Sequence, residues 1–276
     1  MRPNNSFKPT PCRGIGHVLY ATLAHVRRPA TGRLNSSVRP YMTRSFGLVE
    51  DKLRESEYFL ELLSKSSKHS QEARFCFSAF VSATRSVTWA LQAGLKGVDG
   101  FEEWYSTAQS TLKSDLLAPH FVDFRNSIQK TGENPIGQVD SKNLRHYLVA
   151  QLNGTAPRHI LVHPATREMI DAVQASEAYL VSIVRVVYDC YMKFRTVVDP
   201  QWHFTKQSFE KSGMTFNDAL QELGYPSSWG DALPLGVDGW SVLRNHMPGC
   251  AINDIFHARL GQIVLGPDDQ REQAKA

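Results

Sequence analysis

Cysteine is scarce in this sequence, and the short motifs of several large enzyme classes are absent. The 276 residues include four cysteines without a CxxC pair, and three of the four lie beyond residue 46. An odd number of cysteines there argues against a disulfide framework and favours a reduced, cytoplasmic compartment. No GxxxxGK[ST], GxGxxG, HExxH or GxSxG motif occurs. The sequence therefore lacks the signatures of those enzyme classes and predicts no cofactor.

Acidic residues are missing from the first 41 residues, which hold seven Lys or Arg and five of the fourteen prolines. The formal net charge of the chain is +4, from 31 basic and 27 acidic residues. Removing those seven leaves 24 basic residues against 27 acidic ones, so the rest of the chain is slightly acidic. The basic character belongs to the first 41 residues and does not by itself indicate a nucleic-acid-binding body.

The first 46 residues show neither helical nor strand periodicity, and we expect them to be a disordered or non-native leader. The apolar run GHVLYATLAHV is interrupted by polar residues and has no clean cleavage site after it, which argues against a secretory signal, although an organelle transit peptide stays an alternative. The run NNSFKPTPCRGIGHVLYATLAHVRRPATGRLNS resembles the translation of a recombination site that flanks integron gene cassettes. The resemblance covers residues 1–41. It implies a mobile-cassette gene and makes Met42 a plausible start of translation, in place of Met1.

Long hydrophobic runs are also missing. The most apolar segment, AYLVSIVRVVYDCYM, is too short to span a bilayer and contains Arg185 and Asp189. We therefore expect no membrane partner.

Apolar residues at spacings of three and four predict helices through most of the chain. The first four are expected at 47–65, 71–95, 101–114 and 121–132, and short links between them favour an antiparallel bundle over 47–132. The second helix, QEARFCFSAFVSATRSVTWALQAGL, is the most apolar of the four. We expect it to be central in the bundle.

The second region, 138–266, is expected to be helical and to pack on the first. Its one exception is a small β-hairpin near 143–163, where LRHYLVAQL and RHILVH flank NGTAP. Further helices are predicted at 165–197, at 215–223 with Thr215 as N-cap, and near 238–246 and 251–263. Residues 267–276 are expected to be a disordered tail. The fold class is thus mainly α: one or more helical bundles with one small hairpin.

Histidines and cysteine near the C-terminus suggest a metal site that we do not favour. His246, Cys250, Asp254 and His257 lie within twelve residues and are chemically possible zinc ligands. The spacing is equally typical of unrelated polar residues near a helix end. We therefore predict no metal site. Three further histidines, on the expected hairpin, are interpreted as partly exposed polar strand positions: His146, His159 and His163.

The segment FRNSIQKTG carries the sequence's clearest functional hint. Residues 48–132, including this segment and the helix FSAFVSATRSVTWAL, resemble the HEPN superfamily of helical-bundle proteins. In that family an Arg, often followed by Asn, precedes a His near the end of a helix. The resemblance implies metal-independent RNA cleavage at a dimer interface or, in inactive members, binding of RNA, nucleotide or a protein partner. It maps onto Arg125, Asn126 and, at the histidine position, Lys130.

Those three residues suit phosphate binding better than catalysis. Arg125 could stabilise phosphate charge, and Asn126 could position a phosphate by hydrogen bonds. A lysine has an ordinary pKa of about 10.4 and becomes a useful base at neutral pH only when burial lowers that pKa by about three units. On an ideal helix Arg125 and Lys130 also point about 140° apart.

Three interpretations stay open at this point. The preferred one is a non-catalytic, HEPN-like protein that binds RNA, a nucleotide, a second copy of itself or a cognate protein. The alternatives are a toxin-like ribonuclease and a purely structural or regulatory helical module, in which Arg125 and Lys130 are solvated cations.

Overall fold

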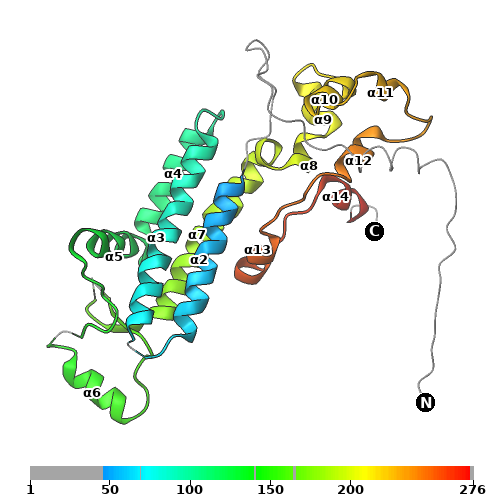
Figure 1. The fold of residues 1–276 in the computed structure, drawn as a ribbon. Coiled ribbons are helices and arrows are strands. Elements are labelled where there is room, and N and C mark those ends of the chain that lie inside the picture. Colours follow the sequence, from blue (N-terminus) through cyan, green and yellow to red (C-terminus); the bar gives the residue numbers. More distant parts are fainter. Residues whose placement is uncertain (1–45, 69, 140, 164–165, 274–276) are drawn as a thin grey trace, which may run out of the picture. The chain divides into compact units, whose positions relative to one another are not determined.

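The fold is known from a computed structural model, which describes residues 46–68, 70–139, 141–163 and 166–273. The chain divides into two units, residues 1–40 and 41–276. The expected leader, apart from Phe46, and the alternative start of translation at Met42 lie outside the described residues. The described chain is mainly α-helical with one two-stranded sheet, which confirms the predicted fold class (Figure 1).

Helices α2 (Gly47–Lys65) and α3 (Gln71–Leu95) form a helical hairpin with the predicted bounds. The apolar stripe of α2 is buried, as is a broader face of α3. Ser70 begins α3 as its N-cap, because its hydroxyl accepts a hydrogen bond from the Ala73 amide at 3.1 Å. The two helices bury their apolar faces largely against each other and against α7 (Ala172–Val198).

Helix α4 (Phe101–Ser114) has the predicted bounds, and α5 (Ala118–Thr131) begins three residues earlier than predicted. Asp115 lies between them and begins α5, because its Oδ1 accepts from the amides of Leu117 and Ala118 at 2.8 and 2.9 Å. Its other oxygen accepts from the Ser182 hydroxyl of α7 at 2.8 Å. Gly132 ends α5 in the left-handed conformation, with φ of 74°.

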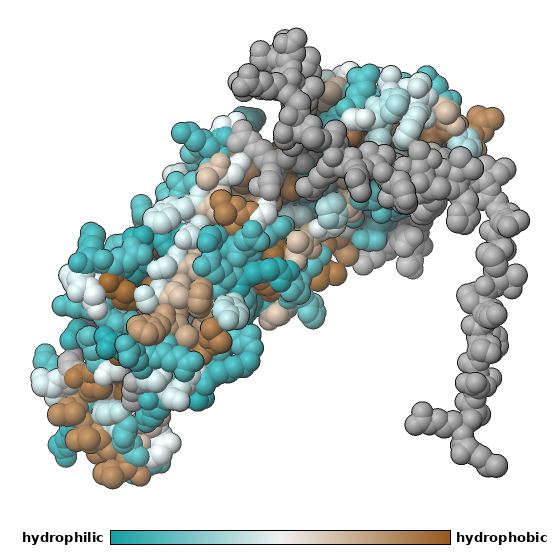
Figure 2. All heavy atoms as spheres, in the orientation of Figure 1, coloured by the Kyte–Doolittle hydropathy of each residue, from teal (hydrophilic) through white to brown (hydrophobic). Residues whose placement is uncertain are grey.

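The small sheet is present, but its strands differ from the predicted pair. Strand β1 (Ile160–Val162) pairs antiparallel with β2 (Met169–Asp171), and the segment expected as the first strand is helix α6 (Leu144–Leu152). Leucine, alanine, arginine and glutamine favour helix, and they outweigh the Asn-Gly signal after them. Gly154, with φ of 69°, follows the end of α6 instead of forming a hairpin turn. No residue of α6 is buried, and apolar side chains over it reach the surface (Figure 2).

The same sheet explains why α7 begins later than predicted. Met169 and Ile170 were expected in the helix and lie in β2. Asp171 ends the strand and caps the helix, since its carboxylate accepts from the amides of Val173 and Gln174 at 2.8 and 3.1 Å. The apolar pattern of 169–170 fits either structure, and the cap decides between them.

Helix α7 joins the two predicted regions in one hydrophobic core. That core draws buried residues from Phe46 to Val264 and includes both sides of the loop around residue 135. A second, smaller core collects Phe204, Phe209, Leu220 and Leu243. The remaining helices are α8 (Pro200–His203), α9 (Lys206–Lys211), α10 (Phe216–Glu222), α11 (Ser228–Asp231), α12 (Gly239–Arg244) and α13 (Asn253–Leu260). No helix among the described residues has the length and hydropathy to cross a membrane.

The expected C-terminal tail is partly helical, since Pro267–Gln273 forms α14. Residues 274–276 lie outside the described part. An ion pair holds α14 on the protein. The buried guanidinium of Arg244 donates to the two carboxylate oxygens of Asp268 at 2.9 and 2.6 Å. It also donates to the Phe204 carbonyl at 3.2 Å. The charged residues of 267–276 suggested a solvated tail, because the sequence does not show that a buried arginine more than twenty residues earlier pairs with one of them.

Candidate functional site

Aromatic packing fixes α5 against α3 and α7. Phe121 is 1% exposed, and its ring stacks on Tyr179 of α7 with centroids 4.4 Å apart. Phe77 and Phe80 of α3 approach the same ring at 6.0 and 6.1 Å. This contact sets the rotation of α5, and so determines where Arg125, one helical turn further on, is directed.

Arg125 lies against an exposed tryptophan of the neighbouring helix. Its Cζ is 5.0 Å from the ring centroid of Trp89 of α3, which is 44% exposed. Arg85, one turn before Trp89, places its own Cζ 5.2 Å from the same ring. A tryptophan face attracts cations through its quadrupole, so one indole holds two guanidinium groups together.

Hydrogen bonds orient both guanidinium groups. Arg125 Nη1 donates to the Asn126 Oδ1 at 3.1 Å, and Arg85 Nη1 donates to the Thr88 hydroxyl at 2.9 Å. Arg125 Nε is buried and has no hydrogen-bond partner among the described residues. Each guanidinium carries five N–H donors, so both retain donors for an anion. A ring face beside two fixed cations is chemically suited to a base and its phosphates.

The structure brings together two of the three residues that the sequence singled out. Arg125 and Asn126 are in contact, whereas Lys130 is exposed in the last turn of α5. Among the described residues, the Lys130 side chain forms no hydrogen bond or ion pair. Its amine is not drawn into the Arg125 and Trp89 contact.

Sequence reasoning missed Trp89 and Arg85. A signal was available in the sequence. Arg85 and Trp89 stand four residues apart and so share one side of the helix, and other residues of that helix already form the apolar face that the core needs. Arg85 also lines a cavity of about 310 Å³ between α3, α4, α5 and α7. Lys113, Asp123 and Gln109 also line it. The candidate site is therefore the α3–α5 face, defined by Arg85, Trp89, Arg125 and Asn126.

The residues considered as zinc ligands take other roles. Asp254 forms a two-point ion pair with Arg54, at 3.0 and 3.1 Å. Cys250 lies beside the Tyr191 hydroxyl, and burial raises the pKa of its thiol to about 11. In the described part of the chain no group of three or more His, Cys, Asp or Glu side chains is arranged to hold a metal ion.

Two of the three histidines expected on the hairpin differ from their predicted settings. His159 was expected to be a partly exposed strand residue, and it is fully buried, with its Nε2 3.2 Å from the Ser66 hydroxyl. Burial lowers the pKa of His159, which favours its neutral form. His146 is exposed, but it lies on helix α6 and not on a strand. His163 accepts a hydrogen bond from the Thr166 amide.

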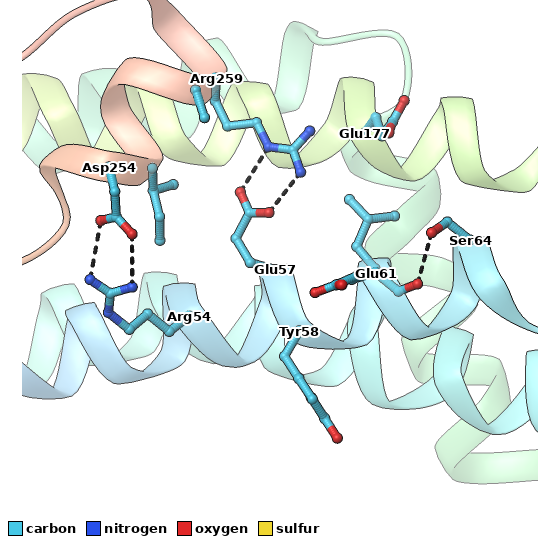
Figure 3. A pocket seen from close by; sticks show the side chains of 11 residues that line it. Arg54, Glu57, Tyr58, Glu61, Ser64, Glu177, Asp254 and Arg259 are labelled. Atoms are coloured by element: carbon cyan, nitrogen blue, oxygen red, sulfur yellow. Dashed lines mark hydrogen bonds and ion pairs between the residues drawn. The ribbon is translucent and has the colours of Figure 1, made fainter. Parts of the chain in front are cut away.

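A larger open pocket of about 680 Å³ lies between α2, α7 and α13 (Figure 3). Two bidentate ion pairs cross it: Arg54 with Asp254, and Arg259 with Glu57 at 2.8 and 2.6 Å. The carboxylates of Glu57 and Asp254 are thus already matched by cations. We interpret the pocket as a polar seam that holds α13 to α2.

Part of the chain is similar to a phage protein family. Residues 48–174 match the family model of bacteriophage lambda protein ea47. The match runs from α2 into the first turn of α7, includes the whole α3–α5 face, and covers a little under half of the chain. No curated protein and no solved structure matches.

Proposed function

We propose that this is a cytoplasmic, non-catalytic protein that binds single-stranded RNA on its α3–α5 face. In this proposal Trp89 stacks against a base, and Arg85 and Arg125 hold the neighbouring phosphates. The observation that carries it is the exposed Trp89 ring flanked by two guanidinium groups at 5.0 and 5.2 Å. Successive bases stack on aromatic side chains and phosphates follow cations in proteins that bind single strands.

The geometry favours binding over cleavage. A metal-independent ribonuclease needs a group that accepts the 2′-hydroxyl proton beside the cation that stabilises the phosphate. A lysine can accept that proton at neutral pH when burial lowers its pKa. Lys130 is exposed and lies apart from the contact between Arg125 and Trp89. The likeness of FRNSIQKTG to the HEPN motif supports a role in RNA recognition for the same helix. In this proposal Arg125 and Asn126 bind the RNA, and Lys130 has no catalytic role.

The test is a titration of a fluorescently labelled single-stranded RNA of about ten nucleotides, a length that covers one binding groove. Stacking of one base is worth about 1–3 kcal/mol, so Trp89→Ala is expected to weaken binding about 5- to 150-fold. Tyr58→Ala is the matched control, because Tyr58 is an exposed aromatic residue of α2 outside this face. Equal affinities for the Trp89 variant and the wild type would show that the site is wrongly assigned.

Salt dependence separates phosphate contacts from a general loss of structure. Each phosphate contact with a single strand contributes about 0.7 to the slope of log affinity against log salt. Arg125→Ala is expected to reduce that slope by about this amount, whereas Arg125→Lys retains most of it and Arg185→Ala on α7 leaves it unchanged. The same RNA is recovered and sized after incubation. Cleavage by the wild type that Lys130→Ala abolishes would establish the ribonuclease instead, and no binding at all would favour the structural module.

A further inference from the structure

The cavity that Arg85 lines, with a volume of about 310 Å³, reaches from the surface to the hydrophobic core. Its lining includes exposed residues, Lys113 and Asp123, and three buried residues of the core, Ala118, Tyr179 and Ile183. Ligand pockets have volumes of about 300–1,000 Å³, so this one is among the smaller. Because the core closes its inner side, the cavity admits a single small group.

Tyr179 lines this cavity and has a hydroxyl without a hydrogen-bond partner. Its ring is fixed by stacking on Phe121, and the residue is 3% exposed. Within the described part of the chain, its hydroxyl forms no hydrogen bond. A buried donor left without an acceptor costs about 1–3 kcal/mol. A ligand that brings an acceptor into the cavity recovers that free energy.

The Tyr179 hydroxyl is a donor at neutral pH and lies in the field of Arg85. Burial raises the pKa of Tyr179 to about 12, and the positive charge of Arg85 opposes that rise. Asp115 also acts on this hydroxyl, but both of its carboxylate oxygens already accept hydrogen bonds from the protein. The acceptor that Tyr179 lacks must therefore come from elsewhere.

Most of the free polar groups around the cavity are donors. Arg85 uses its Nη1 on the Thr88 hydroxyl and keeps other N–H groups. Lys113 and Gln109 add an amine and an amide, and neither side chain forms a hydrogen bond within the described residues. Asp123 is the acidic residue of the lining, and it is exposed, so water and salt screen its charge. Two cations and a tyrosine hydroxyl are suited to an anion that accepts several hydrogen bonds.

We propose that this cavity binds the terminal phosphate of the RNA strand, with Tyr179, Arg85 and Lys113 as its donors. The inference rests on the proposed function, because Arg85 also lies 5.2 Å from the Trp89 ring and so connects the cavity to the stacking site. A base stacked on Trp89 then belongs to a nucleotide near the end of the RNA.

Charge and shape both favour a terminal phosphate over one within the strand. A phosphate monoester carries a charge of about −1.5 to −2 at pH 7, whereas a phosphate inside the strand carries a single charge. The monoester therefore matches the two cations of the cavity more closely. A cavity that ends at the core also receives the end of an RNA strand, since the middle of a strand would need a way out.

The test compares three RNAs of about ten nucleotides with one sequence and an internal fluorescent label. One has hydroxyls at both ends, one has a 5′-phosphate and one has a 3′-phosphate. The wild type is expected to bind one of the two phosphorylated RNAs at least about tenfold more tightly than the hydroxyl-ended RNA, because hydrogen bonds to a charged group are strong. Equal affinity for all three RNAs overturns this inference and leaves the proposed function standing. No binding of any of them refutes both.

Two variants assign the preference to the cavity. Tyr179→Phe removes the hydroxyl, keeps the ring on Phe121, and is expected to lose most of the preference without a change in affinity for the hydroxyl-ended RNA. Lys113→Ala should lower the preference about two- to fivefold, as expected for an exposed cation. Lys211→Ala, at an exposed lysine of α9, is the matched control and should keep it. Far-UV circular dichroism establishes that the variants are folded, and a preference that both cavity variants retain places the terminal phosphate elsewhere.

A free nucleotide is the other source of a phosphate monoester. Adenosine 5′-monophosphate is therefore titrated into the wild type and into Tyr179→Phe by calorimetry. We expect its binding to be at least about tenfold weaker than that of the phosphorylated RNA, because it cannot reach the cavity and Trp89 as a strand does. Binding as tight as that of the RNA, and lost in Tyr179→Phe, would show a site for a free nucleotide and overturn the assignment to the end of a strand.

Discussion

Replacing Phe121 by alanine is expected to destabilise the protein strongly, because this ring holds α5 in place. Phe121 is 1% exposed and has four aromatic neighbours, which are Phe77, Phe80, Phe124 and Tyr179. Truncating such a residue removes its transfer free energy and leaves a cavity, at a cost of about 3–5 kcal/mol. A domain of this kind is stable by about 5–15 kcal/mol in total, so the change removes a substantial fraction.

Urea unfolding followed by far-UV circular dichroism measures the effect. With a slope of about 3 kcal/mol per molar urea, Phe121→Ala should lower the midpoint by at least about 1 M. The matched control is Phe75→Ala, at an exposed phenylalanine of α3, which should change stability by less than about 0.5 kcal/mol. If the two variants unfold at the same midpoint, Phe121 does not anchor α5, and the placement of Arg125 beside Trp89 loses its structural basis.

Three further changes test other parts of the fold. Asp268→Ala leaves the buried guanidinium of Arg244 unpaired and is expected to cost about 3–5 kcal/mol in urea unfolding, and a cost below about 1 kcal/mol would show that the pair is solvated. Burial raises the pKa of Asp199, so the folded state holds this proton more tightly than the unfolded chain, and stability falls as pH rises from about 4 through the folded pKa. Asp199→Asn keeps an acceptor for the Tyr191 hydroxyl and should reduce that fall in thermal melts between about pH 4 and 7, while an unchanged pH profile would contradict the assignment. Thr215→Ala removes the capping box of α10 and should cost about 1 kcal/mol, most of which Thr215→Ser restores.

Local sequence patterns predicted most of the helices and the buried residues of α2 and α3. The stripe of α2 and the capping box at Thr215 are determined by residues close together in sequence, and both are found as predicted. The strand pair was misplaced because short apolar runs fit either helix or strand, and the deciding feature was the cap at Asp171. Helix α14 was missed because its partner, Arg244, is distant along the chain.

The candidate site was partly predictable for the same reason. Arg125 and Asn126 are neighbours in sequence, and a short motif pointed to them. Trp89 and Arg85 lie on another helix, and only the packing of α5 on α3 shows that their side chains meet Arg125. The sequence also gave Lys130 a possible place in the site, and helical geometry directs it elsewhere.

Helix α5 is fastened to the core at both ends. Before its first residue, both oxygens of Asp115 are engaged, one by the amides of Leu117 and Ala118 and the other by Ser182 of α7. Beyond its last residue, the buried Asn134 side chain donates to the Arg74 carbonyl of α3 at 2.8 Å. The fourteen residues of the helix span about 21 Å, so a tilt of about 3° would move one end by about 1 Å, and the restraints at both ends oppose it. A ligand at Trp89 would therefore meet guanidinium groups that are already in place, which keeps the entropic cost of ordering the site on binding low.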